Sequence, residues 1–346
     1  MKERRVGIEY LRIISMLCIV GNHFLLFTKA LNNVVPFTAN YYLVWLLEAM
    51  GYVGVDCFVL ISGYFLIQSK FSLKKIVALI GEVLFYSIII LVVLSLLKIN
   101  AYSYVDVLKS MMPISTRQYW FITDYIALYL LSPFLNCGLI NLGRKKYQCL
   151  ICCLILLFSI WDIFPGEQLG AQHGYSLYWL IVLYCIGAYI RIYGGGVLKS
   201  KKGMTFLYVI CIILMWSSKI MIALIEKKIP KLDVYSTIFY CHSSIFVLGA
   251  AIALFMIFKD VNTQKYRLKK IVLKVSASTF GVYLIHMNIN LANVYWKKIT
   301  SYIDVNKLSL FIWYIIVTLM IYTLCTIIDM ARGVIVNQIK IRGKKL

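Results

Sequence analysis

Two ionisable side chains, Arg12 and His23, lie in the first apolar stretch and are eleven residues apart. If this stretch is helical, His23 lies about 20° past three full turns from Arg12, so the two share one face. Ionisable groups within a membrane span are rare and usually face a bundle interior or a water-filled cavity. A histidine there can take a proton, and an arginine can hold a planar or bidentate partner. The pair predicts a functional site inside the membrane.

His286 also lies within an apolar stretch, late in the chain. We expect it at a depth similar to that of His23, so that the two histidines share one cavity. Asp124 is a further candidate, because a carboxylate can orient a histidine tautomer. The alternatives are a hydrogen bond between packed helices for His286 and a place at the outer membrane interface for Asp124.

The composition indicates which elements position these residues. Of 346 residues, 62% are hydrophobic and 14% are charged, whereas a soluble domain carries about 25% charged residues. Apolar stretches near 20 residues, long enough to cross a bilayer, recur along the chain. We predict an all-α, polytopic membrane helix bundle forming one domain over residues 1–346. Its ten expected spans are 8–28, 43–67, 76–97, 119–140, 147–164, 176–193, 204–225, 236–258, 276–295 and 308–330.

The distribution of positive charge predicts the orientation of the bundle. With the N-terminus inside, 25 of the 36 Lys and Arg residues fall on the inner side, 10 fall outside, and Lys219 lies within a span. Cytoplasmic loops carry this excess, so we expect both termini to be cytoplasmic. The same distribution argues against nucleic-acid binding despite the net charge of +22. The first span is not expected to be a cleaved signal peptide, because Glu9 and Arg12 interrupt it.

The ten cysteines do not suggest a disulfide framework, because most lie inside apolar stretches where they can serve as small packing residues. Cys149, Cys152 and Cys153 lack the second ligand pair that a zinc site needs. We therefore expect no metal and no disulfide.

Several segments, in this order and spacing, resemble the acyltransferase-3 family of membrane acyltransferases, which O-acetylate bacterial surface polysaccharides. The first runs from Glu9 to Met16 and is completed by His23, giving the family's pattern of Arg, ten residues, then His. The others are Gly54–Tyr64, Tyr119–Phe121 with Tyr129–Asn136, Tyr184–Ile190, and Phe280–His286. The resemblance covers nearly the whole chain.

This resemblance implies an acyl-CoA donor, usually acetyl-CoA, bound from the cytoplasm of a bacterial cell. The acceptor would be a hydroxyl of a surface polysaccharide or of its lipid-linked precursor. A sugar hydroxyl is a poor nucleophile, and a positioned imidazole that takes its proton is the commonest remedy. His23 is the expected general base, with Arg12, His286 and Asp124 as further catalytic candidates. We expect acceptor contacts from Glu9, Asp56, Ser62, Tyr119, Trp120 and His242.

The donor phosphates are expected to contact Lys74, Lys75 and Arg12. Many family members carry an arginine-rich pattern where this chain has Ser72-Leu73-Lys74-Lys75, and lysine lacks the bidentate fork of arginine. The expected cavity spans the membrane, because His23 lies about 16 Å farther along the helix than Arg12. Small and polar residues would line it: Gly51, Gly54, Asp56, Ser62 and Gly63.

Two alternatives use the same buried groups differently. A transporter or flippase for a lipid-linked saccharide would gate a pathway with them, but such proteins often show internal repeats, and the two halves of this chain show none. A polysaccharide polymerase would need a large outer loop, whereas the longest expected outer loop is 98–118. A serine hydrolase is disfavoured, because Ser62 lacks a Gly-x-Ser-x-Gly context.

Overall fold

The computed structural model describes residues 5–164, 169–194, 200–262 and 266–342, and the regular structure of these residues is entirely helical. Within them, seven helices are long and apolar enough to cross a membrane: α1 (Val6–Phe27), α3 (Ala39–Leu66), α4 (Leu73–Leu96), α6 (Trp120–Asn141), α7 (Arg144–Ile155) with its continuation to Ile163, α9 (Lys201–Glu226) and α14 (Ser309–Arg342). Two shorter apolar helices are α8 (Leu177–Tyr193) and α10 (Ile245–Phe258). The remaining α-helices are α2 (Ala30–Asn33), α5 (Tyr104–Met111), α11 (Tyr266–Ala277), α12 (Thr279–His286) and α13 (Ile289–Thr300), and short 3-10 turns lie at Gln172–Gly174 and Pro230–Tyr235. The prediction of an all-α membrane bundle is confirmed, with a span number close to ten.

Two of the expected spans are not continuous helices. Residues 276–295 take in the end of α11, all of α12 and the first part of α13. The break between α12 and α13 follows from Asn288, whose side chain accepts hydrogen bonds from the backbone N–H groups of Asn290 and Leu291. This cap begins a new helix and ends the old one. The expected span 236–258 becomes helical only at Ile245, because Ser244 caps α10 and the residues before it form an irregular segment.

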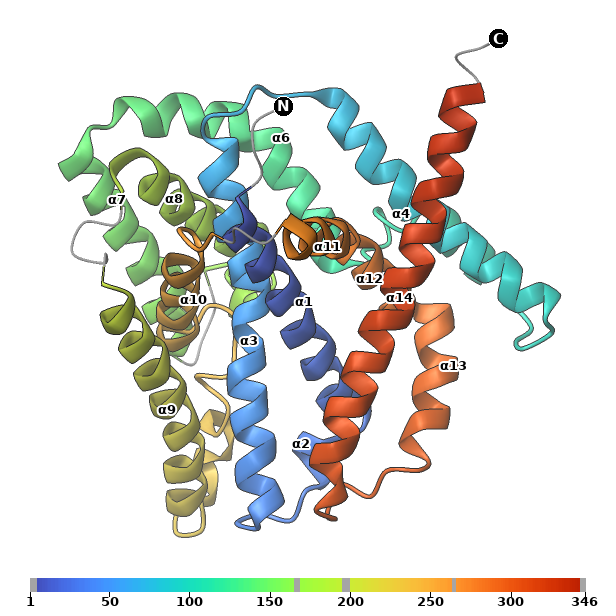
Figure 1. The fold of residues 1–346 in the computed structure, drawn as a ribbon. Coiled ribbons are helices and arrows are strands. Elements are labelled where there is room, and N and C mark those ends of the chain that lie inside the picture. The colour runs from blue at the N-terminus through green and yellow to red at the C-terminus, as the bar shows by residue number, and fades with distance from the viewer. Residues whose placement is uncertain (1–4, 165–168, 195–199, 263–265, 343–346) are drawn as a thin grey trace.

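Close helix crossings hold α3 at the centre of the bundle (Figure 1). A Cβ atom added at Gly63 would collide with the backbone of Tyr184, and one added at Gly187 would collide with the backbone of Leu60. Small residues at such crossings let helix backbones approach closely, which drives association in membranes. The crossing with α8 therefore fixes the position of α3, which lines the site.

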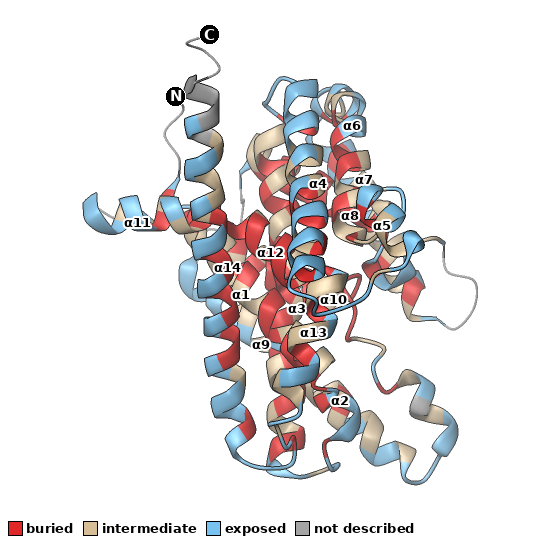
Figure 2. Cartoon of the chain, turned by 90° about the vertical axis from the view of Figure 1, so that its right-hand side faces the viewer, coloured by how far each residue is buried: buried red, intermediate tan, exposed pale blue. Residues whose placement is uncertain are grey.

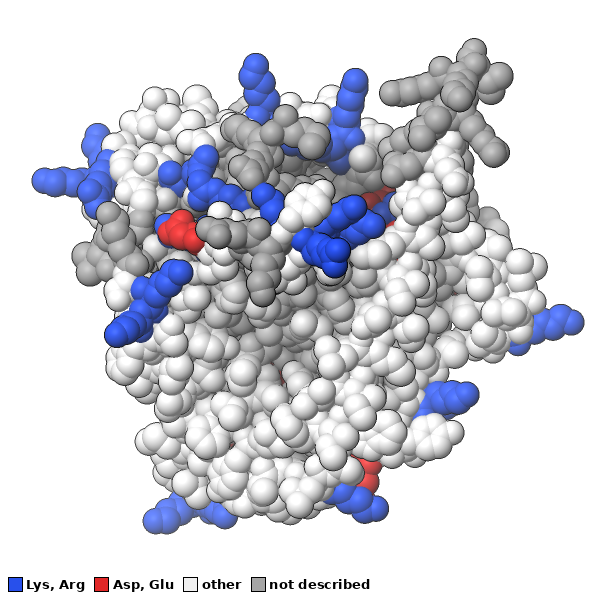
Figure 3. All heavy atoms as spheres, in the orientation of Figure 1, with Lys and Arg blue, Asp and Glu red and all other residues white. Residues whose placement is uncertain are grey.

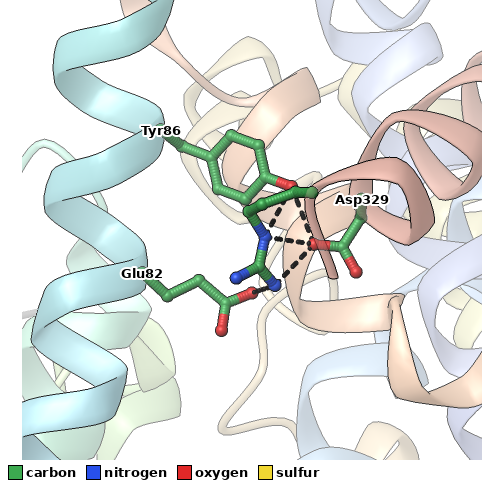
Figure 4. Close-up of polar contacts among 4 residues, drawn as sticks. Glu82, Tyr86 and Asp329 are labelled. Atoms are coloured by element: carbon green, nitrogen blue, oxygen red, sulfur yellow. Dashed lines mark hydrogen bonds and ion pairs between the residues drawn. The ribbon is translucent and has the colours of Figure 1, made fainter. Parts of the chain in front are cut away.

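A half-buried arginine, Arg332, joins α4 to α14. Arg332 donates to Glu82 at 2.6 Å and to Asp329 at 2.8 Å, and the Tyr86 hydroxyl donates to Asp329 at 2.7 Å (Figure 4). One guanidinium thus neutralises two carboxylates on neighbouring helices.

The surface agrees with a membrane setting. On the face in Figure 3, Lys and Arg side chains gather toward the upper and lower ends and at the right-hand edge, and the central surface between them is nearly free of charge. α1 begins and α14 ends at the same end of the molecule (Figure 1), as expected if both termini lie on one side. Near this end α11 projects sideways from the bundle (Figure 2), and its exposed Tyr266 and Ile271 stand beside basic residues. This composition suits a helix lying in the membrane interface.

Candidate active site

A cavity of about 590 Å³ lies inside the bundle, bounded by α1, α3, α6, α12 and the segment before α10. On α1 it is lined by one stripe: Arg12, Met16, Ile19, Asn22, His23 and Leu26. At 1.5 Å per residue this stripe extends about 21 Å along the helix axis. The predicted shared face of Arg12 and His23 is therefore the face that lines the cavity.

His23 and His286, 263 positions apart in the chain, meet at this cavity. Nδ1 of His23 lies 2.9 Å from Nε2 of His286, and Nδ1 of His286 lies 2.6 Å from the Val282 carbonyl oxygen. The carbonyl only accepts, so His286 Nδ1 carries a proton and its Nε2 accepts the Nδ1 proton of His23. Nε2 of neutral His23 then carries the unprotonated lone pair. His23 lines the cavity, whereas His286 is buried behind it.

The end of α12 is fixed in place by hydrogen bonds from two tyrosines. The Tyr119 hydroxyl donates to the Leu284 carbonyl and accepts from the Asn288 side chain, and the Tyr295 hydroxyl donates to the His286 carbonyl. Tyr119, expected to contact the acceptor, is buried and lies outside the cavity lining. Its contacts instead hold the helix that carries His286.

The imidazole of His242 also faces the cavity, where it is surrounded by aromatic side chains. Its ring centroid lies 5.1 Å from that of Tyr52, 5.0 Å from Tyr175 and 6.0 Å from Trp120. Asp56 is fully buried behind it, with one carboxylate oxygen 3.7 Å from Nδ1 of His242. The Trp179 indole donates to the same oxygen at 3.4 Å. The structure thus brings His242, Trp120 and Asp56 together.

Two polar groups of the cavity were missed by the sequence reasoning. Glu48 and Asn22 line it, and Glu48 Oε2 and Asn22 Oδ1 are buried without a hydrogen-bond partner among the described residues. The Asn22 amide is 3.5 Å from the Glu48 carbonyl oxygen. Gly51, also in the lining, leaves the room that Asn22 occupies. The signal for Glu48 was available, since an acidic residue inside the expected span 43–67 is as unusual as Asp56.

Arg12 lines the cavity and lies 3.6 Å from the buried carboxylate of Glu9, one turn earlier on α1. Glu9 does not line the cavity; it is placed to hold the guanidinium. Ser62 also lines the cavity, where its hydroxyl donates to the Phe58 carbonyl at 2.9 Å and lies 3.3 Å from the Tyr125 hydroxyl. Gly54 and Gly63 do not line it, because they pack against neighbouring backbone.

Three other predicted residues lie apart from the cavity. Asp124 forms an ion pair with Arg117 at 2.8 Å, and it is not part of the lining. Lys74 and Lys75 are exposed at the start of α4 and do not line the cavity either.

A pair of arginines at the same end of the bundle was not predicted. Arg5, just before α1, donates to the Tyr64 hydroxyl at 2.7 Å, and Arg191 donates to the same hydroxyl at 3.1 Å. Both guanidinium groups also lie over the Tyr64 ring, at 5.6 and 4.9 Å from its centroid. Two cations held this close to one another can bind a phosphate or another anion.

The comparisons with known proteins identify the family of the chain. A family model described as an acyltransferase domain matches residues 5–330, which include the Arg12–His23 stripe and His286. No curated protein and no solved structure matches the chain. Because the matched region is nearly the whole chain, this multi-pass membrane protein belongs to the acyltransferase-3 family.

Proposed function

We propose that this protein is an O-acyltransferase of the bacterial cytoplasmic membrane. It moves an acyl group, acetyl from acetyl-CoA, to a hydroxyl of a surface polysaccharide or of its lipid-linked precursor. The observation that carries the proposal is the His23–His286 pair at a cavity that extends along α1 from Arg12.

The proposed reaction uses His23 as the general base. Its Nε2 takes the proton of the acceptor hydroxyl as that oxygen attacks the thioester carbonyl carbon, and the carbon–sulfur bond breaks as the tetrahedral intermediate collapses. The imidazolium then returns the proton to the CoA thiolate. His286 is a positioning residue, because its Nε2 accepts from Nδ1 of His23 and so keeps the lone pair on the atom that reacts.

The donor enters from the cytoplasmic end. Its phosphates bind to cations there, with Arg12, Lys74 and Lys75 as the predicted contacts and the Arg5–Arg191 pair as a further group. Arg12 and His23 are about 16 Å apart along α1, a distance that the extended pantetheine arm of CoA must cover. The thioester therefore reacts away from the bound phosphates.

The acceptor occupies the part of the cavity near Trp120 and His242. Aromatic faces there suit the apolar face of a sugar, and the Glu48 carboxylate and Asn22 amide offer hydrogen-bond partners to its hydroxyls.

The deciding experiment is mass spectrometry of surface glycans from cells with the gene, without it, and with a His23→Ala variant. Acyl transfer predicts that the deletion and the variant each lack one acyl group per repeat unit while the glycan persists. Loss of the whole glycan in the deletion strain would instead identify a flippase or polymerase.

A further inference from the structure

Three side chains that could ligate a metal meet on the segments joining α7 to α8 and α9 to α10, outside the proposed chemistry. Asp162, His173 and Cys241 each offer one ligand atom, and these atoms all lie within 4.8 Å of one another. Asp162 lies in the short helical turn that ends α7, His173 in the turn before α8, and Cys241 in the segment before α10. The chain folds three separate segments onto one point.

The carboxylate of Asp162 is incompletely satisfied. Its side chain is 2% exposed, and Oδ1 is buried without a hydrogen-bond partner among the described residues. The other oxygen, Oδ2, accepts from the Ser243 hydroxyl at 2.5 Å and lies 3.5 Å from Nδ1 of His173. A buried carboxylate with an unpaired oxygen is costly, and a cation bound to that oxygen would remove the cost.

We propose that Asp162, His173 and Cys241 form a zinc site. One carboxylate oxygen, one imidazole nitrogen and one thiolate are the ligand types that Zn²⁺ prefers, and the thiolate disfavours Mg²⁺ and Ca²⁺. In a tetrahedral site, ligand atoms about 2.0 to 2.3 Å from zinc lie about 3.3 to 3.7 Å from one another. The three ligand atoms would therefore have to move about 1 Å closer together when zinc binds. Water takes the fourth position, and the Cys241 thiol loses its proton to solvent as zinc binds.

The surroundings suit this site. The Ser243 hydroxyl donates to Oδ2 of Asp162, and such a contact orients a ligating carboxylate. The His173 side chain is 54% exposed and provides a route for the ion from solvent. Cys241 is buried, which protects its sulfur from oxidation.

Zinc at this point would stabilise the outer wall of the cavity. The backbone N–H of His242 donates to the His173 carbonyl at 3.1 Å, and Tyr175 stands two residues beyond His173. Both His242 and Tyr175 line the cavity. The metal would act on structure, not on the reacting atoms.

The test measures zinc directly in the full chain, purified in detergent without a polyhistidine tag. We expect about one zinc per chain by elemental mass spectrometry, and a loss of about tenfold or more in zinc affinity for Asp162→Asn, His173→Ala and Cys241→Ser. Cys211→Ser is the matched control, because Cys211 is also buried but lies outside the cluster. Chelation should lower the thermal midpoint of the wild type, and added Zn²⁺ but not Mg²⁺ should restore it.

Cobalt replacement keeps the proposal testable if a variant fails to fold. Co²⁺ added to chelated wild-type protein should give the visible bands of tetrahedral cobalt and a thiolate charge-transfer band. The charge-transfer band should persist in Cys211→Ser. Wild-type protein without zinc, with a midpoint indifferent to chelator and metal, would overturn the proposal. Zinc retained equally by all three cluster variants would also overturn it.

Discussion

At the scale of single residues, the chemistry depends on which ring nitrogen of His23 carries the proton. The contact between His286 and the Val282 carbonyl decides this, because it leaves Nε2 of His286 as an acceptor. In the proposed reaction the two histidines therefore have unequal roles: His23 faces the cavity and would react, and His286 holds it in position. This inequality makes the roles separable by mutation.

His23→Ala is expected to lower turnover by about 100- to 10,000-fold, the usual contribution of a general base. His286→Ala should cost about tenfold, or about 1.4 kcal/mol, because it removes one buried hydrogen bond. His286→Gln, whose side-chain oxygen can still accept from His23, should recover part of that loss. The turnover number for acyl transfer, measured for each of the three purified variants, tests these expectations. Equal losses for both alanine variants would contradict the assigned roles.

Arg12→Ala is expected to abolish acylation while the protein still inserts and purifies. Arg12→Lys should also fail, because the lysine ammonium cannot reproduce a planar, bidentate contact. Near-normal turnover of Arg12→Lys would show that only charge matters at this position. The matched comparison is Glu9→Gln, which leaves Arg12 in place without its carboxylate partner.

The donor phosphates can be located by comparing two paired variants. If they bind near α4, Lys74→Ala with Lys75→Ala should raise the KM for acyl-CoA and leave kcat at saturating donor unchanged. If they bind the Tyr64-centred pair, Arg5→Ala with Arg191→Ala should do so instead. An unchanged donor KM in both double variants would move the phosphate site to another loop.

At the scale of helices, two sets of contacts fix the helices that carry and support His286. The Asn288 cap ends α12 at His286, and the hydrogen bonds of Tyr119 and Tyr295 hold that end. A continuous helix over 276–295 would lack this junction. The Arg332 cluster meanwhile links α4 to α14, which packs on α12.

Arg332→Met is expected to destabilise the protein by about 1 to 2 kcal/mol, between the values for exposed and fully buried ion pairs, because Arg332 and Glu82 are half-buried and only Asp329 is buried. Here it would leave both Glu82 and Asp329 unpaired. Adding Glu82→Gln and Asp329→Asn to Arg332→Met should restore most of the loss, since the buried charge is then gone. Thermal unfolding in detergent measures the effect; a triple variant no better than Arg332→Met would show that packing dominates.

At the scale of the whole molecule, the proposed function requires the cavity to admit a donor from one face and an acceptor from the other. The stripe on α1 extends about 21 Å along the helix. The end of the cavity away from Arg12 is lined by the non-helical segment that carries His242 and by the break between α12 and α13. Water and substrates would then reach His23 without crossing lipid.

Cysteine labelling tests this arrangement in a variant cleared of its native cysteines, four of which are exposed among the described residues. A cysteine at position 23 should react with a small impermeant reagent from outside and be protected by acyl-CoA added on the cytoplasmic side. A cysteine at Leu25, which is fully buried on the same helix, is the control and should stay unlabelled. Position 23 unlabelled from either face would show that His23 is a packed core residue.

The sequence by itself determined the class of fold and the stripe on α1. Hydrophobic stretches of bilayer length and the 100° helical step are local properties, so the spans and the shared face of Arg12 and His23 could be read from neighbouring residues. Tertiary structure alone decided which side chains meet across the chain. It paired His23 with His286, placed Asp124 against Arg117 outside the cavity lining, and gathered Asp162, His173 and Cys241. Such contacts depend on how helices pack and where polar caps interrupt them, and no local periodicity encodes the partner of a distant residue.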